Sequence, residues 1–340
     1  MRGIALCLAL SMPSIGPSAV RAEGFDSFIR LPAGEIAARA GADPAPDLSS
    51  SGPSARPEEL IAEVNRRYDR ARGMGSISAL LAVASAVGDK PMEDVNAAYG
   101  QAKGMGEISA MLAAAAALSG KPISEVNAAY SQARGMGTIS AMLAMASTIG
   151  DKPIADVNAA YGQAKGMGEI SAMLAAAAAL SGKPISEVNA AYSQSRGMGS
   201  ISAALTLGSA LGGVSIRDVN AAYGQAKGMG DVSAMLALGA ALSGKPISEL
   251  NAAYSQASGM GTISAMLAVA SALGDRPIAD VNAAYAQARG MGEVSALLTL
   301  GAMAQGADPA GRRRLAAVLI AHLVFAEEEN QASYTQPSSD

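Results

Sequence analysis

One tripeptide sets the pattern of this chain. Gly-Met-Gly occurs eight times at a spacing of 31 residues, and the residues between the copies repeat as well. A fixed period of roughly 20 to 50 residues is typical of arrays in which each unit packs only on its neighbours. The period therefore favours a single array over two ordinary domains. The first glycines of the tripeptides are Gly73, Gly104, Gly135, Gly166, Gly197, Gly228, Gly259 and Gly290.

Each repeat is expected to contain two short helices. Residues 107–118 place large apolar side chains such as Ile108 and Met111 on one arc at helical spacing, with alanine and serine on the other arc. Residues 119–122, Ser-Gly-Lys-Pro, end this helix and start another, because proline suits only a first helical turn. The second helix, over 123–134, is amphipathic and should form the wetter row of the array.

The tripeptide itself is expected to be the turn between repeats. Its first glycine would end a helix in a left-handed conformation, and its methionine would fold back onto apolar residues of both helices. Its last glycine would lead directly into the next helix. The residue that follows alternates between hydroxyl and acid, and both types are favourable at a helix start. These residues are Ser76, Glu107, Thr138, Glu169, Ser200, Asp231, Thr262 and Glu293.

The resulting prediction is an all-α fold, an α-solenoid of 31-residue two-helix repeats with about seven to eight units over residues 57–304. A helix beginning at Pro57 is a second helix with no first helix before it, so it is expected to be the N-terminal capping helix. Residues 305–330 are expected to form a C-terminal capping helix, and 331–340 a disordered tail.

The first residues are typical of a secretory signal. Arg2 precedes a short apolar run, and small residues stand at the expected cleavage point near Ala22. The alternative is an N-terminal helix of the folded domain. With a signal peptide over 1–22 and a flexible linker over 23–56, the protein is expected to be periplasmic or secreted. Cys7, the only cysteine, would be removed with the signal, so disulfides and thiolate metal sites are not expected.

Charge and hydropathy limit the possible partners. Loss of the signal peptide removes two arginines and no acid, which changes the net charge from −4 to −6. A mildly acidic protein is a poor binder of nucleic acid. The sequence also contains no apolar run of the ~18 residues that a membrane span needs.

An asparagine and a tyrosine also recur with the same period. Each asparagine is expected to be structural, because a half-buried amide must bond to backbone at a neighbouring helix end or turn, and we call the set the asparagine ladder. A ligand-binding role is the alternative. The members are Asn65, Asn96, Asn127, Asn158, Asn189, Asn220, Asn251 and Asn282. Tyrosine is expected to bury its ring and keep its hydroxyl at the rim, which also makes a candidate binding row. This row is Tyr99, Tyr130, Tyr161, Tyr192, Tyr223, Tyr254 and Tyr285.

Catalysis, metals and cofactors are not expected. Thioethers suit Cu(I), but equivalent residues on stacked helices lie roughly 8–10 Å apart, too far to share one ion. His322, the only histidine, is interpreted as a core-edge residue and not as a general base. The glycines lack the spacing of a dinucleotide-binding or phosphate-binding loop.

Regularity then favours binding over chemistry. Identical faces repeated along an axis make a long surface and no localised site. The leading hypothesis is a non-catalytic, secreted or periplasmic scaffold that binds a protein or peptide along an extended helical surface. The alternative is a structural component of the cell envelope or an appendage, in which copies self-associate through their alanine-rich faces.

Overall fold

The computed structural model describes residues 56–335. The predicted signal peptide, nearly all of the predicted linker and residues 336–340 lie outside the described residues. Residues 331–335, expected to belong to a disordered tail, are helical instead, because α18 continues to Thr335. Within this range all regular secondary structure is α-helical, and short helices alternate with the predicted turns. The expectation of an all-α protein built from repeated helix pairs is confirmed.

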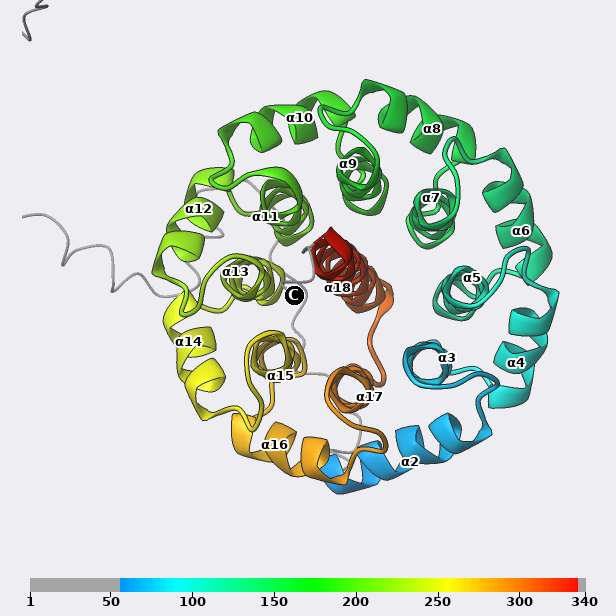
Figure 1. The fold of residues 1–340 in the computed structure, drawn as a ribbon, viewed down its shortest axis with the longest axis vertical. Coiled ribbons are helices and arrows are strands. Elements are labelled where there is room, and N and C mark those ends of the chain that lie inside the picture. The colour runs from blue at the N-terminus through cyan, green and yellow to red at the C-terminus, as the bar shows by residue number, and fades with distance from the viewer. Residues whose placement is uncertain (1–55, 336–340) are drawn as a thin grey trace, which may run out of the picture. The chain divides into compact units, whose positions relative to one another are not determined.

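The helices form two concentric rings around one central helix, α18 (Pro309–Thr335) (Figure 1). The inner helices are seen end-on in Figure 1, and the outer helices lie along the circumference. The inner ring consists of α3 (Ser76–Val87), α5 (Glu107–Ser119), α7 (Thr138–Ile149), α9 (Glu169–Ser181), α11 (Gly199–Gly212), α13 (Asp231–Ser243), α15 (Thr262–Leu273) and α17 (Glu293–Met303). The outer ring consists of α2 (Pro57–Arg70), α4 (Met92–Gln101), α6 (Ile123–Gln132), α8 (Ile154–Gln163), α10 (Ile185–Gln194), α12 (Ile216–Gln225), α14 (Ile247–Gln256) and α16 (Ile278–Gln287).

Composition explains which helices lie inside. The inner helices are buried on nearly all sides, and residues on opposite arcs of α5, such as Met111 and Ala113, have no exposed surface. Alanine lets neighbouring inner helices approach closely, while the larger residues fill the remaining space. The outer helices are amphipathic: Val126 of α6 is buried, whereas Ser124 and Glu125 are exposed.

The two ends of the repeat array meet and close the ring. Helix α17 packs against α3, and α2 packs against both α16 and α17. At this seam Asn65 Nδ2 donates to the carbonyl of Gln287 at 2.8 Å, and the Arg289 N–H donates to Asn65 Oδ1 at 2.8 Å. Arg289 also lies 3.4 Å from the carboxylate of Asp69. The asparagine hydrogen bonds of the seam are therefore the same as those at every other junction between repeats.

Closure corrects the role expected for the N-terminal helix. Helix α2 is not a cap at the end of an open stack, because it is the outer partner of α17 and completes the eighth helix pair. The described array begins with the outer half of a repeat and ends with an inner half, so the two halves complement each other. The apolar side that a terminal unit would expose is buried instead against the other end.

The expected C-terminal cap is also placed differently. Helix α18 does not cover an end of the array, because it enters the ring and packs against α7, α9, α11 and α13 (Figure 1). Its first turn lies at the carboxyl end of α5, where Arg312 Nη1 donates to the carbonyl of Leu118 at 3.5 Å. Its later residue His322 lies with Glu293, the first residue of α17. Helix α18 thus runs antiparallel to the inner helices.

This direction explains an unfavourable charge order in the sequence. Three arginines, Arg312 to Arg314, stand at the amino end of α18, where its own dipole disfavours positive charge. The antiparallel arrangement places this end beside the carboxyl ends of inner helices, whose dipoles favour positive charge. The unfavourable interaction of these arginines with the dipole of α18 is therefore offset by the dipoles of the neighbouring inner helices.

The Gly-Met-Gly turns differ from the expected geometry. The outer helix ends at Gln132, three residues before Gly135, and Ala133 is already extended. Gly135 has φ +139°, and a β-carbon on it would lie 2.6 Å from Cγ2 of Ile139. Gly137 has φ 58° and ψ −127°, a backbone conformation open essentially to glycine alone. The first glycine is therefore required by close packing and the second by conformation.

Two glycine substitutions are expected to have opposite effects. Gly135→Ala should lower the free energy of unfolding by about 1 to 3 kcal/mol, because its positive φ strains any other residue and the new methyl group meets Ile139. Gly162→Ala should instead stabilise by about 0.5 to 1 kcal/mol, since Gly162 lies inside α8, where alanine is the better helix former. Urea unfolding of both variants measures the difference, and equal effects would contradict the turn geometry.

Candidate binding face and central cavity

The asparagine ladder joins each repeat to the previous one. Asn127 Nδ2 donates to the carbonyl of Gln101 at 2.9 Å, and its Oδ1 accepts from the Lys103 N–H at 2.8 Å. The amide thus satisfies two backbone groups of the chain that leaves α4. The other seven asparagines make the same pair of hydrogen bonds. Both polar ends of each amide are engaged within the protein.

The tyrosines of the candidate binding row lie near the carboxyl ends of the outer helices. Their side chains are half-buried and pack against the hydrophobic core, with the exposed remainder on the outer wall of the ring. The backbone carbonyl of Tyr130 accepts the N–H of Ala133 where α6 ends, and the same bond recurs in the other repeats. The tyrosine side chains therefore contribute to the packing of the outer helices on the core.

The turns carry the most exposed apolar side chains of the described protein. Every methionine of the Gly-Met-Gly copies is 85 to 88% exposed. The expectation that these methionines fold back onto both helices is therefore wrong. The turn leaves an outer helix and immediately enters an inner one, so its middle residue points away from both. These residues are Met74, Met105, Met136, Met167, Met198, Met229, Met260 and Met291.

All eight turns lie on one side of the ring. Every helix pair is connected in the same way, so all inner helices begin on the same side. The contact between Ser76 Oγ and Glu107 Oε1, at 3.4 Å, joins the first residues of two neighbouring inner helices and confirms this. We call this side, with its eight exposed methionines, the methionine face.

Basic residues surround the methionine face. Seven of the eight tripeptides are preceded directly by an exposed lysine or arginine, and Ser258 takes this place in the remaining one. Lys103 Nζ donates to Ser131 Oγ at 3.0 Å, which holds that ammonium group over the next outer helix. We call this set the basic ring, and it consists of Arg72, Lys103, Arg134, Lys165, Arg196, Lys227 and Arg289.

The opposite side of the ring carries charges of both signs. Lys121, in the turn before α6, lies 2.9 Å from Asp151 of the next repeat and 3.1 Å from Glu125 of α6. The hydrogen bond to Asp151 raises the pKa of Lys121, and the same contact lowers the pKa of Asp151. Lys245, Asp275 and Glu249 repeat this arrangement. Exposed pairs of this kind contribute little to stability, so this side is best described as solvated.

A cavity of about 260 Å³ lies inside the ring, between α18 and the helices α3, α5 and α17. Its walls are apolar and include Leu80, Met111, Leu297 and Leu319, all of them buried. It occupies the side of the interior opposite the helices against which α18 packs. The cavity exists because α18 lies off-centre in the ring.

The polar groups of this cavity belong to the first residues of three inner helices and to α18. Ser76, Glu107 and Glu293 line it and are exposed, so the cavity opens on the methionine face. The equivalent residues of α7, α9, α11 and α13 are half-buried or buried. His322 of α18 also lines the cavity and is only 6% exposed.

The setting of His322 favours the neutral form of its side chain. Burial lowers its pKa, and the nearby Glu293 carboxylate opposes this only in part. Its Nδ1 is buried and has no hydrogen-bond partner within the described protein. His322 therefore lies at the edge of the core, as expected, and its Nδ1 has no hydrogen-bond partner there. Buried polar atoms without partners are uncommon and point to strain or to an interaction with something else.

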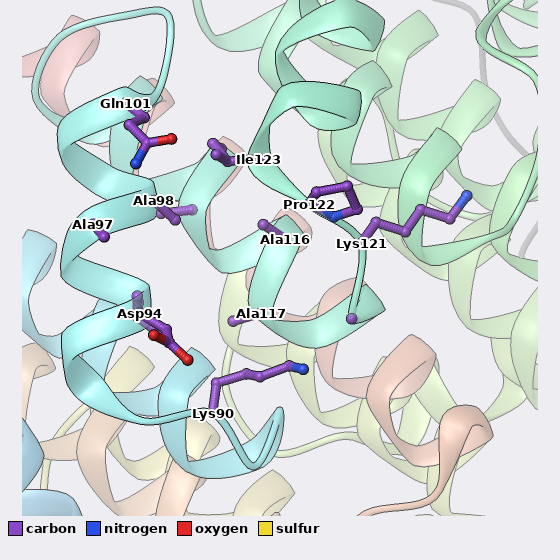
Figure 2. A pocket seen from close by; sticks show the side chains of 13 residues that line it. Lys90, Asp94, Ala97, Ala98, Gln101, Ala116, Ala117, Lys121, Pro122 and Ile123 are labelled. Atoms are coloured by element: carbon purple, nitrogen blue, oxygen red, sulfur yellow. The ribbon is translucent and has the colours of Figure 1, made fainter.

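The outer wall contains shallow grooves between neighbouring repeats. Figure 2 shows one of them, with Ala97 and Ala98 on one wall, Ala116 and Ala117 on the other, and Lys90 at the edge. A similar groove lies one repeat further on, between α6 and the turn before α8. Alanine walls offer a partner little area and few hydrogen bonds. These grooves are weaker binding candidates than the methionine face.

The comparisons with models of known protein families and with characterised proteins give no match to this chain. Its own geometry therefore carries the functional argument. Among residues 56–335 there is no group of three or more histidine, cysteine, aspartate and glutamate side chains placed to hold a metal ion. In the same range, none of the helices combines the length and the hydropathy that crossing a membrane requires.

Proposed function

We propose that this protein is a non-catalytic scaffold, acting in the periplasm or after secretion, that binds a protein partner through its methionine face. The observation that carries the proposal is the exposure of eight methionines at equivalent positions of one surface. Exposed methionines with flexible, polarisable side chains are typical of surfaces that bind protein partners. In this proposal the partner binds the circle of eight turns, and not a groove along an open array.

Internal repetition supports an intermolecular role for these methionines. The glycines beside them are required by the turn, but an 86%-exposed side chain such as Met105 contributes little to the fold. Repeats differ at other exposed positions: helix α2 has Arg66 where Ala97 and its equivalents stand in the later repeats, yet Met74 follows it unchanged. A residue kept in all eight copies without a packing reason suggests a contact outside the chain.

The basic ring indicates the chemistry of the partner. Seven positive side chains around the methionines favour a partner with acidic groups placed around apolar pockets. The same charges disfavour a second copy docked face to face, since like charges would oppose each other across the contact. The alanine-rich faces of the inner helices are buried inside the ring, which makes side-by-side association through them a weaker alternative.

Photo-crosslinking tests this proposal. Methionine can be replaced throughout by its photoreactive diazirine analogue, and the protein can be irradiated in an extract of the compartment to which it is exported. We expect an adduct with a second protein. A variant with glutamine at all eight exposed positions should fold unchanged, because these side chains are outside the core. It should also lose the adduct.

Buried methionines provide the matched control. Met111, Met142 and Met173 have no exposed surface, so they should crosslink only within the chain in both proteins. An adduct that persists in the glutamine variant would show that another surface binds the partner. Adducts with lipid alone, or with further copies of this chain alone, would also overturn the proposal and would favour a membrane surface or self-association.

A further inference from the structure

We propose that the central cavity is a binding site for a small organic cation, an amine with one ammonium group and a short apolar body. This inference does not depend on the proposed protein partner. It rests on the shape of the cavity, the charges at its opening and the unpartnered nitrogen of His322.

The walls of the cavity select an apolar ligand body. Leu80 of α3, Leu297 of α17 and Leu319 of α18 face the same space, and Met111 adds an adaptable thioether. A volume of about 260 Å³ is below the roughly 300 to 1,000 Å³ typical of pockets for drug-sized ligands. The site therefore fits a compact molecule such as a short alkylamine.

The opening selects positive charge. Glu107 and Glu293 are the first residues of α5 and α17, the two inner helices on either side of α3. Their carboxylates favour a cation and disfavour an anion, although three helix amino ends point to the same region. Because the two acids stand on helices separated by α3, one ammonium group bonds one of them and is attracted by the other across the opening. Ser76 between them adds a hydroxyl acceptor.

His322 adds an imidazole to the wall. It lines the cavity, is 6% exposed, and its buried Nδ1 has no hydrogen-bond partner. Because Nδ1 itself has almost no accessible surface, a rotation of the ring on binding would bring it to the ligand, and with the imidazole proton on Nε2 it would accept an N–H bond. An ammonium group carries three N–H donors, which can serve one carboxylate at the opening and this nitrogen. The cavity thus combines an apolar wall with acceptors that match one ammonium group.

The single histidine makes binding directly observable. Protein labelled with ¹³C and ¹⁵N in histidine gives one imidazole signal from the folded protein, that of His322. The probe is hexylammonium, titrated at a pH of about 8, where an imidazole of ordinary or lowered pKa is neutral. We expect a saturable shift of the His322 resonances. Hexan-1-ol and hexanoate, which share the apolar chain, should bind at least about tenfold more weakly.

A charge-neutral variant tests the role of the opening. Glu107→Gln with Glu293→Gln should weaken hexylammonium binding at least about tenfold, the loss expected when hydrogen bonds to charged groups are removed. The matched control is Glu169→Gln, at the same position of α9, outside the cavity lining. It should leave the affinity unchanged. All three glutamates are at least partly exposed, so the variants are expected to fold.

Three results would overturn the proposal. The first is an imidazole signal that does not respond to hexylammonium, and the second is equal binding of the alcohol and the amine. The third is an equal loss of affinity in the control variant and the double variant. Failure of the crosslinking experiment on the methionine face has no bearing on these outcomes, so the two proposals can fail separately.

Discussion

Replacing Ile320 by aspartate is expected to destabilise this protein severely. Ile320 has no exposed surface on α18, which lies inside the ring (Figure 1). A carboxylate at this position would be a buried charge without a partner, at a cost on the order of 3 to 5 kcal/mol. The inner helices would then lose the helix that covers the buried side chains facing the interior. A large fall of the urea midpoint, together with binding of a hydrophobic dye, is the expected result.

The control for this variant lies on the same helix. Ala310 is exposed in the first turn of α18, close in sequence to Arg312, Arg313 and Arg314, so a carboxylate there is solvated and near positive charge. Ala310→Asp should therefore leave the midpoint unchanged or raise it slightly. If Ile320→Asp unfolds at the same urea concentration as the wild type, α18 does not occupy the ring in solution and the central cavity does not exist.

The second large effect tests whether the ring is closed. Asn65→Ala should lower the free energy of unfolding by about 1 to 3 kcal/mol, because the carbonyl of Gln287 and the N–H of Arg289 both lose their partner. Asn158→Ala removes the equivalent pair of hydrogen bonds, to Gln132 and Arg134, within the array. In a closed ring the two substitutions remove the same interaction.

Comparison of these two variants shows whether the ring is closed. Equal losses of unfolding free energy in urea indicate that the seam is formed like any other junction. In an open array Asn65 would have no repeat before it, so Asn65→Ala would be nearly neutral while Asn158→Ala remained costly. That outcome would show that α2 is a terminal capping helix of an open array.

The repeat unit could be predicted because its signals are local. The spacing of Gly135 and its equivalents fixes the period, Pro122 marks the start of the second helix, and alternating apolar arcs define both helices. The hydrogen bonds of Asn127 follow from the rule that a half-buried amide needs partners. Each of these inferences uses residues close together in one repeat.

Closure could not be predicted in the same way, because it depends on the rotation between neighbouring repeats. Eight units close a ring only when each turns by about 45°, and small packing differences decide this angle. One signal was nevertheless present. The array begins with an outer helix at Pro57 and ends with an inner helix at Met303, so each end has the half that the other lacks.

The methionines show where a local argument fails. An apolar side chain between two helices is expected to pack on them, and this was the interpretation for Met136. The turn is too short for that, because Gly137 directly precedes the first residue of α7. The cavity was likewise beyond sequence reasoning, since His322 and Glu293 meet only because α18 turns back through the ring.

A closed ring also limits how this gene can change. An open solenoid gains or loses units by duplication and deletion, because each new unit extends a free end. Here the addition of a ninth pair would alter the angle at every junction and widen the space that α18 fills. Mutation can therefore change individual side chains, but the number of repeats is held constant by geometry.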